Sequence, residues 1–141
     1  MDNLDVVLVT ESDQFDILSE LYQQSEINGT FGGYRVDRIV GAEISFLINL
    51  NDKPIGFILL VREFKRKNDL SIDIAISKEY RKKGYGRKAM EIFKEKYVPR
   101  INDSLIAEVN KQNVAANKLI NVLDVEQKET IGESNIYSVR R

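Results

Sequence analysis

The chain has no cysteine and no histidine among its 141 residues. Without cysteine it can form no disulfide, no thiolate zinc site and no cysteine nucleophile. Without histidine it lacks the commonest general base and the commonest metal ligand of proteins. Any proton transfer must therefore use carboxylates, tyrosine, lysine or water, and we expect no bound metal.

Long apolar runs are also missing. No segment approaches the roughly 18 apolar residues of a membrane span, and the first ten residues, MDNLDVVLVT, lack the basic start of a signal peptide. With 43% hydrophobic and 30% charged residues, the composition is that of an ordinary globular protein. We expect a single domain over residues 1–141 that is cytoplasmic and does not associate with a membrane.

Apolar periodicity and turn signals predict an alternation of strands and helices. Strands are expected at 4–10, 43–50, 54–63, 70–77 and 104–110, and a closing hairpin over 125–141 turns on Gly132. Helices are expected at 14–24, capped by Ser12 or Asp13, and at 36–40, 85–97 and 113–123. This order predicts the α+β class, a mixed sheet with helices packed on it.

The segment EYRKKGYGRKAM (79–90) is rich in glycine and positive charge. Its letters match the dinucleotide-binding pattern G-x-G-x-x-A, in which Glu108 could contact a ribose. Two facts oppose that fold: Gly84 does not directly follow the end of the strand, and only 33 residues follow Glu108. A Walker A loop is excluded as well, because the pattern G-x-x-x-x-G-K-[ST] does not occur.

The physical chemistry of this segment still favours a phosphate-bearing ligand. Glycines allow consecutive N–H groups to converge, and the helix that begins near Tyr85 adds the positive end of its dipole. Between 78 and 88 there are six basic residues and one acidic residue, a local charge of +5 in a chain of net charge −1. The alternatives are a solvated charge run and, less well matched to the near-neutral chain, nucleic acid.

The segment IDIAIS-KEYRKKGYGRKAM resembles the acyl-CoA binding motif of the GNAT superfamily of CoA-dependent N-acetyltransferases. Arg81, Gly84 and Gly86 occupy the three defining positions of [Q/R]-x-x-G-x-[G/A]. Downstream, AEVNKQNVAANKLINVLDV is similar to the family pattern N-x-x-[AS]-x-x-x-Y-x-x-L-G-F, with Asn113 and Ala116 in register. The resemblance implies a GNAT-like fold: a central mixed, mostly antiparallel sheet with helices on both faces.

The resemblance also implies a ligand, a partner and a set of contacting residues. Acetyl-CoA is expected as cosubstrate and a primary amine of a small molecule or peptide as acceptor, with no nucleic acid partner, in a monomer or homodimer. The residues implied in cofactor binding are Ile74, Ile76, Arg81, Lys82, Lys83, Gly84, Tyr85, Gly86, Arg87 and Asn113.

The sequence departs from the family at two positions. Ile120 stands where the family commonly has the tyrosine that protonates the departing thiolate, and Asp124 stands where glycine is usual. Another group or water must replace the acid, or turnover is weak. Two functions stay open: an N-acetyltransferase, or a weakly catalytic module that binds acyl-CoA as a sensor or structural partner.

Asp73 is the first candidate for general base or acceptor anchor. Ile72, Ile74 and Ile76 share one face of the strand, so Asp73 shares the other with Ala75. The alternative is a strand residue paired with a cross-strand lysine or arginine. Further candidates, each with a structural alternative, are Glu108 and then Glu43 as base, Tyr137 as acid, and Phe31 and Tyr34 as acceptor walls.

Overall fold

The structure is a computed structural model that describes residues 2–24, 42–62 and 68–140. The helix expected at 36–40 and the acceptor walls Phe31 and Tyr34 lie outside these ranges. The strands are β1 (Leu4–Leu8), β2 (Ala42–Leu50), β3 (Lys53–Arg62), β4 (Asp69–Ile76), β5 (Ser104–Asn110), β6 (Val125–Ile131) and β7 (Ser134–Val139). The helices are α1 (Ser12–Gln24), α3 (Tyr85–Lys96) and α4 (Val114–Ile120), with short 3₁₀ turns at Lys78–Tyr80, Val98–Arg100 and Asn121–Leu123.

The start of α1 differs from the sequence prediction. Ser12 is already helical, so neither Ser12 nor Asp13 is the cap. Instead the side-chain oxygen of Gln14 accepts hydrogen bonds from the backbone N–H groups of Thr10 and Glu11, at 2.8 and 2.9 Å. A side chain inside the first turn thus satisfies donors that precede the helix, a reversal that propensity alone does not predict.

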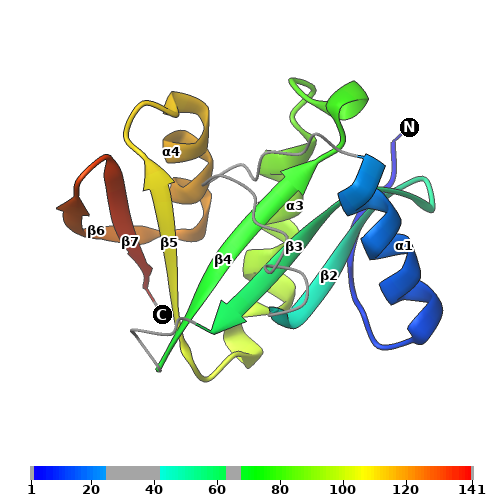
Figure 1. The fold of residues 1–141 in the computed structure, drawn as a ribbon, viewed down its shortest axis with the longest axis horizontal. Coiled ribbons are helices and arrows are strands. Elements are labelled where there is room, and N and C mark those ends of the chain that lie inside the picture. The colour runs from blue at the N-terminus through cyan, green and yellow to red at the C-terminus, as the bar shows by residue number, and fades with distance from the viewer. Residues whose placement is uncertain (1, 25–41, 63–67, 141) are drawn as a thin grey trace.

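The seven strands form one sheet in the order β1-β2-β3-β4-β5-β7-β6 (Figure 1). Only β4 and β5 run parallel; the other neighbouring pairs of the described sheet are antiparallel. The predicted mixed, mostly antiparallel sheet is therefore confirmed. The predicted turn between β2 and β3 has Asn51 and Asp52 at φ 50° and 65°, as a two-residue hairpin loop requires.

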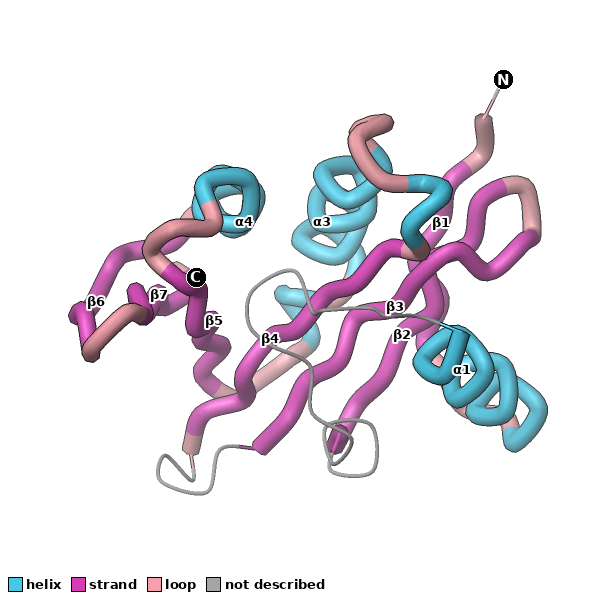
Figure 2. Tube along the Cα trace, turned by 45° about the horizontal axis from the view of Figure 1, so that its top comes forward, coloured by secondary structure: helices cyan, strands magenta, loops and turns pink. Residues whose placement is uncertain are grey.

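Helices cover both faces of the sheet, as predicted. α3 and α4 lie side by side on one face and α1 lies on the other (Figure 2). The larger core packs under α3 and α4 and includes Ile74, Phe93 and Ile120. A smaller core packs under α1 and includes Leu18 and Leu59. None of the helices in the described ranges is long and apolar enough to cross a membrane.

The parallel pair β4–β5 is short, and this shapes the centre of the molecule. Pairing covers only three positions, from Asp69 with Ser104 to Ser71 with Ile106. Beyond them the two strands diverge (Figure 1), and β5 continues against β7 alone. We call residues 72–76 of β4 the open edge, because in this segment β4 faces β5 without pairing to it.

Candidate functional site

The loop 77–84 leads from the end of β4 to the start of α3. Its 3₁₀ turn is closed by the N–H of Tyr80 to the carbonyl of Ser77, at 2.9 Å, and by the N–H of Arg81 to that of Lys78, at 3.3 Å. Two left-handed residues follow, Lys82 at φ 62° and Gly84 at φ 83°. Alternation of left-handed and ordinary residues makes consecutive N–H groups converge, the geometry that binds anions.

The N-terminus of α3 is not capped by a side chain. Gly84 occupies the N-cap position, and the first helical hydrogen bond runs from the N–H of Lys88 to the carbonyl of Gly84, at 3.2 Å. The N–H groups of residues 85–87 consequently have no acceptor within the helix, and they lie at its positive end. A Cβ on Gly84 would meet no atom within 4 Å, so the space before these donors is open. We call the N–H groups of residues 84–87 the anion cradle.

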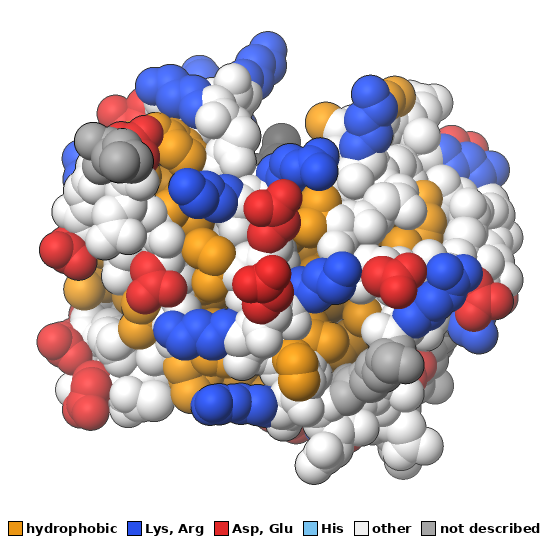
Figure 3. Space-filling view, turned by 180° about the vertical axis from the view of Figure 1, so that it is seen from behind, with side chains coloured by type: hydrophobic (Ala, Val, Ile, Leu, Met, Phe, Trp, Pro, Cys, Tyr) orange, Lys and Arg blue, Asp and Glu red, His pale blue; other side chains and the backbone are white. Residues whose placement is uncertain are grey.

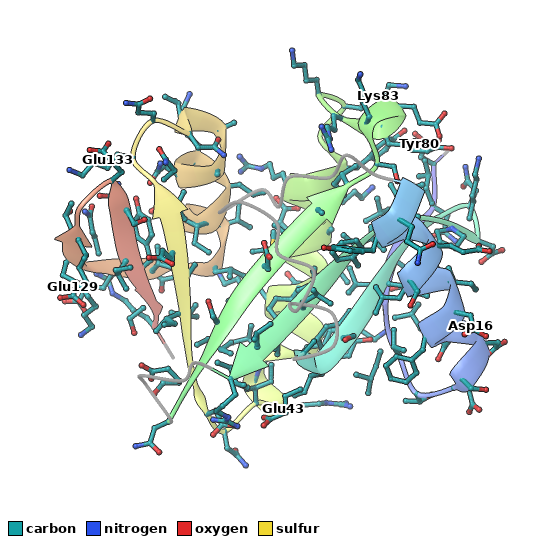
Figure 4. The ribbon with its side chains drawn as sticks, in the orientation of Figure 1. Asp16, Glu43, Tyr80, Lys83, Glu129 and Glu133 are labelled. Atoms are coloured by element: carbon teal, nitrogen blue, oxygen red, sulfur yellow. The ribbon has the colours of Figure 1, made fainter. Side chains whose placement is uncertain are left out.

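Basic side chains surround this cradle. Lys83 points away from the body of the protein (Figure 4), and Arg87 is exposed, with its Nε 3.2 Å from the carboxylate of Glu91. On the face covered by α3 and α4, Lys and Arg side chains stand on both sides of a notch at the upper edge (Figure 3). Residues 81–88 thus supply mobile positive charge around fixed backbone donors, as the sequence predicts for a phosphate site.

Arg81 and Tyr85 have partners of their own. The Nε of Arg81 donates to the carbonyl of Ile76 at 2.8 Å. The hydroxyl of Tyr85 donates to the carboxylate of Asp2 at 2.9 Å, and this hydrogen bond raises the pKa of Tyr85 above its ordinary value. The Tyr85 side chain therefore contacts the N-terminal segment, and its backbone N–H is the group that it contributes to the cradle.

The open edge of β4 presents backbone groups next to the cradle. The N–H of Ser77 donates to Ile55 on β3 at 2.7 Å. Because successive residues of a strand direct their N–H and C=O groups to opposite sides, those of Ile76 and Ile74 are directed toward β5. Their side chains are buried in the core under α3. Ile74 and Ile76 can thus contact a ligand through their backbone, at the edge where β5 has diverged.

Asp73 lies on the opposite face, as the alternation predicts. Ala75 packs in the core under α1, whereas Ile74 packs under α3. Asp73 is only 3% exposed, and the residue opposite it on β3 is Leu59. The residue opposite Asp73 on β3 is therefore apolar.

Glu108 reaches the same face from β5. Ala107 and Val109 pack in the core under α3 and α4, so Glu108, which is exposed, is on the other face. The last parallel pair is Ser71 with Ile106, and two residues further along each strand lie Asp73 and Glu108. The two carboxylates consequently flank the point at which β4 and β5 separate.

Glu43 is far from this site. Its carboxylate accepts hydrogen bonds from Arg62, which also bonds Asp103 at 3.2 Å. Both carboxylates raise the pKa of Arg62, so the guanidinium stays charged. Glu43 and Lys83 lie at opposite ends of the sheet (Figure 4). The third candidate base therefore belongs to a surface ion cluster, at the end where β4 and β5 still pair.

Ile120 stands where the family commonly has its tyrosine acid, so this position has no hydroxyl group. Ile120 is fully buried, with an exposed fraction of 0%. Tyr137, the sequence candidate to replace that acid, donates its hydroxyl to Asn117 Oδ1 on α4 at 2.6 Å. Asn117 and Tyr137 line a hollow of about 300 Å³ on the outer side of α4, together with Lys111, Val114, Lys118, Asn121 and Asn135. The hydroxyl of Tyr137 thus cross-links α4 to β7.

Asn113, predicted to contact the cofactor, caps α4 in the structure. Its side-chain oxygen accepts from the N–H of Ala116 at 3.0 Å. Asp124, at the position where the family has glycine, is left-handed at φ 57°. This conformation explains why glycine suits the position, and aspartate tolerates it better than most residues do.

Two features of the site are missing from the sequence predictions. The first is the short β4–β5 pairing. No sequence pattern within either strand predicts it, because its length depends on whether β5 pairs with β4 or with another strand. The second feature is Gly56 on β3, where a Cβ would lie 2.3 Å from the carbonyl oxygen of Ala75. A glycine inside the apolar run PIGFILLV is a signal of close backbone approach that could have been used.

Among the described residues, no three acidic side chains converge as a metal site would require.

Comparisons with known proteins agree on one relationship. The profile of the acetyltransferase (GNAT) family matches residues 11–123, and no curated protein matches the chain by sequence. A solved acetyltransferase from Thermus thermophilus is similar, with 19% identity and a TM-score of 0.63 over 98% of this chain and 96% of that chain. The ribosomal-protein-S18-alanine N-acetyltransferase from Escherichia coli has 18% identity and a TM-score of 0.66 over 99% and 93%. The dodecameric spermidine N-acetyltransferase from Vibrio cholerae has 14% identity and a TM-score of 0.66 over 96% and 91%.

Proposed function

The chain belongs to the GNAT family of acetyltransferases, and from that membership we propose that it transfers acetyl from acetyl-CoA to a primary amine by direct attack in a ternary complex. The observation that carries this proposal is the anion cradle, which lies at the end of the open edge of β4. Two of the similar structures are N-acetyltransferases, one named for an alanine of a ribosomal protein and one for spermidine. Their names support an amine acceptor of small-molecule or peptide type.

The residues present fit acetyl-CoA. Its pyrophosphate needs several converging donors and positive charge, which the cradle and the side chains of Lys82, Lys83 and Arg87 provide. Its pantetheine arm contains amides, which need backbone-like partners, and Ile74 and Ile76 direct such groups toward β5. When bound, acetyl-CoA supplies the thioester that makes the acyl group reactive.

The protein's own residues must then handle a proton. An amine attacks only in its neutral form, and it loses a proton as the C–N bond forms and the C–S bond breaks. Asp73 and Glu108 lie on the face opposite α3 and α4, where Glu108 is exposed and Asp73 is only 3% exposed, so an acceptor on that face would lie beside both strands. We assign Asp73 as the base, directly or through a water, with Glu108 attracting the cationic form of the acceptor. The thiolate takes its proton from water, since Ile120 has none to give.

A thiol-release assay with a panel of primary amines tests this proposal. Asp73→Asn should lower kcat by about 10²- to 10⁴-fold and leave acetyl-CoA affinity nearly unchanged. Glu108→Gln should mainly raise the acceptor KM, because it removes an attractive charge and no proton acceptor. The two substitutions are matched, each replacing a carboxylate by an amide of the same shape. Full activity of Asp73→Asn in both parameters, with Glu108→Gln inactive, would exchange the two roles.

A catalytically weak module that binds acyl-CoA is the alternative, favoured by one observation. The family's acid position is a fully buried isoleucine, and the nearest sequence candidate, Tyr137, bonds Asn117 on the outer side of α4. Such a protein would bind acetyl-CoA in calorimetry and release no thiol with any amine of the panel. Ile120→Tyr would then give activity if the acid alone were lacking.

A further inference from the structure

One basic residue of the site differs from its neighbours in what it contacts. Arg81, Lys82, Lys83 and Lys88 are all exposed, and Arg87 pairs with Glu91 on the surface of α3. Arg81 instead turns back toward the strand that precedes it, and its Nε donates to the carbonyl of Ile76 at 2.8 Å in a partly buried hydrogen bond. The Nε–H donor of Arg81 is therefore used within the protein and cannot bind a phosphate at the same time.

The acceptor of this bond has a defined place. Ile76 is the last residue of β4 and is 8% exposed. Since the next N–H, that of Ser77, donates to β3, the Ile76 carbonyl is directed to the other side, toward β5. On that side, no strand of the described sheet pairs with β4 at this position. Arg81 consequently satisfies the last carbonyl of the open edge, which would otherwise depend on water.

The hydrogen bond from Arg81 to Ile76 joins the two ends of the segment 76–81, just before the cradle begins. The side chain of Arg81 is tied to Ile76, and its backbone N–H is tied to Lys78 at 3.3 Å. The two left-handed residues, Lys82 and Gly84, follow directly. The anchored Arg81 thus sets where the converging N–H groups stand relative to the open edge, two parts of the site that one ligand must contact together.

We propose that Arg81 is a positioning residue, which fixes the cradle against β4 through its Nε–H donor and not through its charge. The inference rests on the proposed function, because the ligand that spans cradle and edge is acetyl-CoA. It revises the sequence prediction that Arg81 contacts the cofactor phosphates. Positioning matters because one ligand must contact the cradle and the open edge together, so a displaced loop weakens its binding.

Covalent structure makes the two roles separable. In glutamine the side-chain amide nitrogen is the same number of bonds from Cα as Nε is in arginine, so Arg81→Gln keeps the donor and removes the charge. Lysine has a methylene at that position, so Arg81→Lys keeps the charge and removes the donor. Arg81→Met keeps the length and removes both. Lys83→Gln is the matched control, since it removes one charge from the same loop and leaves the Ile76 bond intact.

Calorimetric titration of each variant with acetyl-CoA, at 50 and 500 mM NaCl, gives the result. Arg81→Gln should bind within about threefold of the wild type, whereas Arg81→Lys and Arg81→Met should bind about tenfold more weakly at both salt concentrations. Lys83→Gln should bind more weakly at low salt only, because its contribution is screened at high salt. Acyl transfer should show the loss as a raised KM for acetyl-CoA, with kcat at saturation and the melting temperature close to those of the wild type.

The opposite order overturns the inference. If Arg81→Lys binds as the wild type does and Arg81→Gln behaves like Lys83→Gln, Arg81 acts through its charge as a phosphate ligand. If all three Arg81 variants bind like the wild type, the Ile76 bond does not position the cradle. Failure of the proposed function has a different signature: the wild type itself would release no thiol with any amine. If it also bound no acetyl-CoA at either salt concentration, the ligand would be wrong as well.

Discussion

Replacing Gly56 by alanine should be one of the most damaging small changes in this protein. The added Cβ would lie 2.3 Å from the carbonyl oxygen of Ala75 and 3.1 Å from both Cα and Cδ1 of Ile76. A carbon and an oxygen need about 3.2 Å, so the two strands must move apart by nearly 1 Å. Neither strand can yield freely, because Gly56 pairs with Ile76 and the N–H of Ser77 bonds Ile55.

The expected loss of unfolding free energy is the sum of two destabilising effects and one stabilising effect. Overpacking a tight interior costs about 1–3 kcal/mol, and a weakened backbone hydrogen bond costs about 1 kcal/mol. Alanine returns about 0.4–1 kcal/mol by restricting the unfolded chain. The net loss is about 2–3 kcal/mol of unfolding free energy. For a chain of 141 residues the unfolding entropy near 60 °C is roughly 0.3 kcal/mol/K, so the melting temperature should fall by about 7–10 °C.

Gly132→Ala is the matched control. Gly132 has φ 57° and no atom within 4 Å of its Cβ position, so alanine there suffers only left-handed strain, about 1 kcal/mol or 3 °C. Urea unfolding and differential scanning calorimetry measure both variants. In Gly56→Ala the displaced β4 should also weaken acetyl-CoA binding, whereas Gly132→Ala should bind normally. Equal stability of the two variants would refute the close-approach argument.

Substitutions at three other positions each test a single feature. Asn113→Ala should cost about 1 kcal/mol in urea unfolding by removing the cap on Ala116, while Asn113→Asp keeps the cap and the stability; a loss of acetyl-CoA affinity in Asn113→Ala without a loss of stability would instead assign this residue to the ligand. Tyr137→Phe should destabilise by about 1 kcal/mol through the lost bond to Asn117. Its kcat should not change, and a hundredfold fall in kcat would make Tyr137 the acid. Asp124→Gly should be neutral or slightly stabilising, because its ion pair with Arg140 is exposed. Asp124→Val should cost about 1–2 kcal/mol in thermal unfolding, since a branched residue resists φ 57°.

The elements of the fold could be predicted because their signals are local. The apolar run of β4 and the periodicity of α3 fix their type, and Asn51-Asp52 fixes the hairpin between β2 and β3. The cap of α1 was predicted wrongly: a cap at Ser12 or Asp13 would accept from N–H groups within the first turn, whereas Gln14 accepts from the N–H groups of Thr10 and Glu11, which precede the helix. Local propensity alone does not predict which side chain accepts hydrogen bonds at the start of this helix.

The candidate site also has features that local sequence predicts and features that depend on the tertiary structure. The cradle was predictable from Gly84 and the basic residues, because these residues are close together in the sequence. The bond from Arg81 to Ile76, the separation of Asp73 from Glu43, and the bond of Tyr137 to Asn117 all depend on where the chain returns. Sequence could name these residues as candidates, but only the tertiary arrangement places Glu43 in an ion cluster and Tyr137 in a bond between α4 and β7.

The three-position contact between β4 and β5 has a consequence for how the native state opens. The sheet consists of two half-sheets, β1 to β4 and β5-β7-β6, that share few backbone hydrogen bonds and meet through the side chains under α3 and α4. Native-state hydrogen exchange should therefore resolve two cooperative units with different opening free energies. A ligand that contacts both units is lost when either one opens, and at 100 times its Kd it adds about 2.7 kcal/mol to each opening. With acetyl-CoA bound, the slowest amides of both half-sheets should exchange more slowly by the same factor of about 100, because the ligand is lost whichever half-sheet opens.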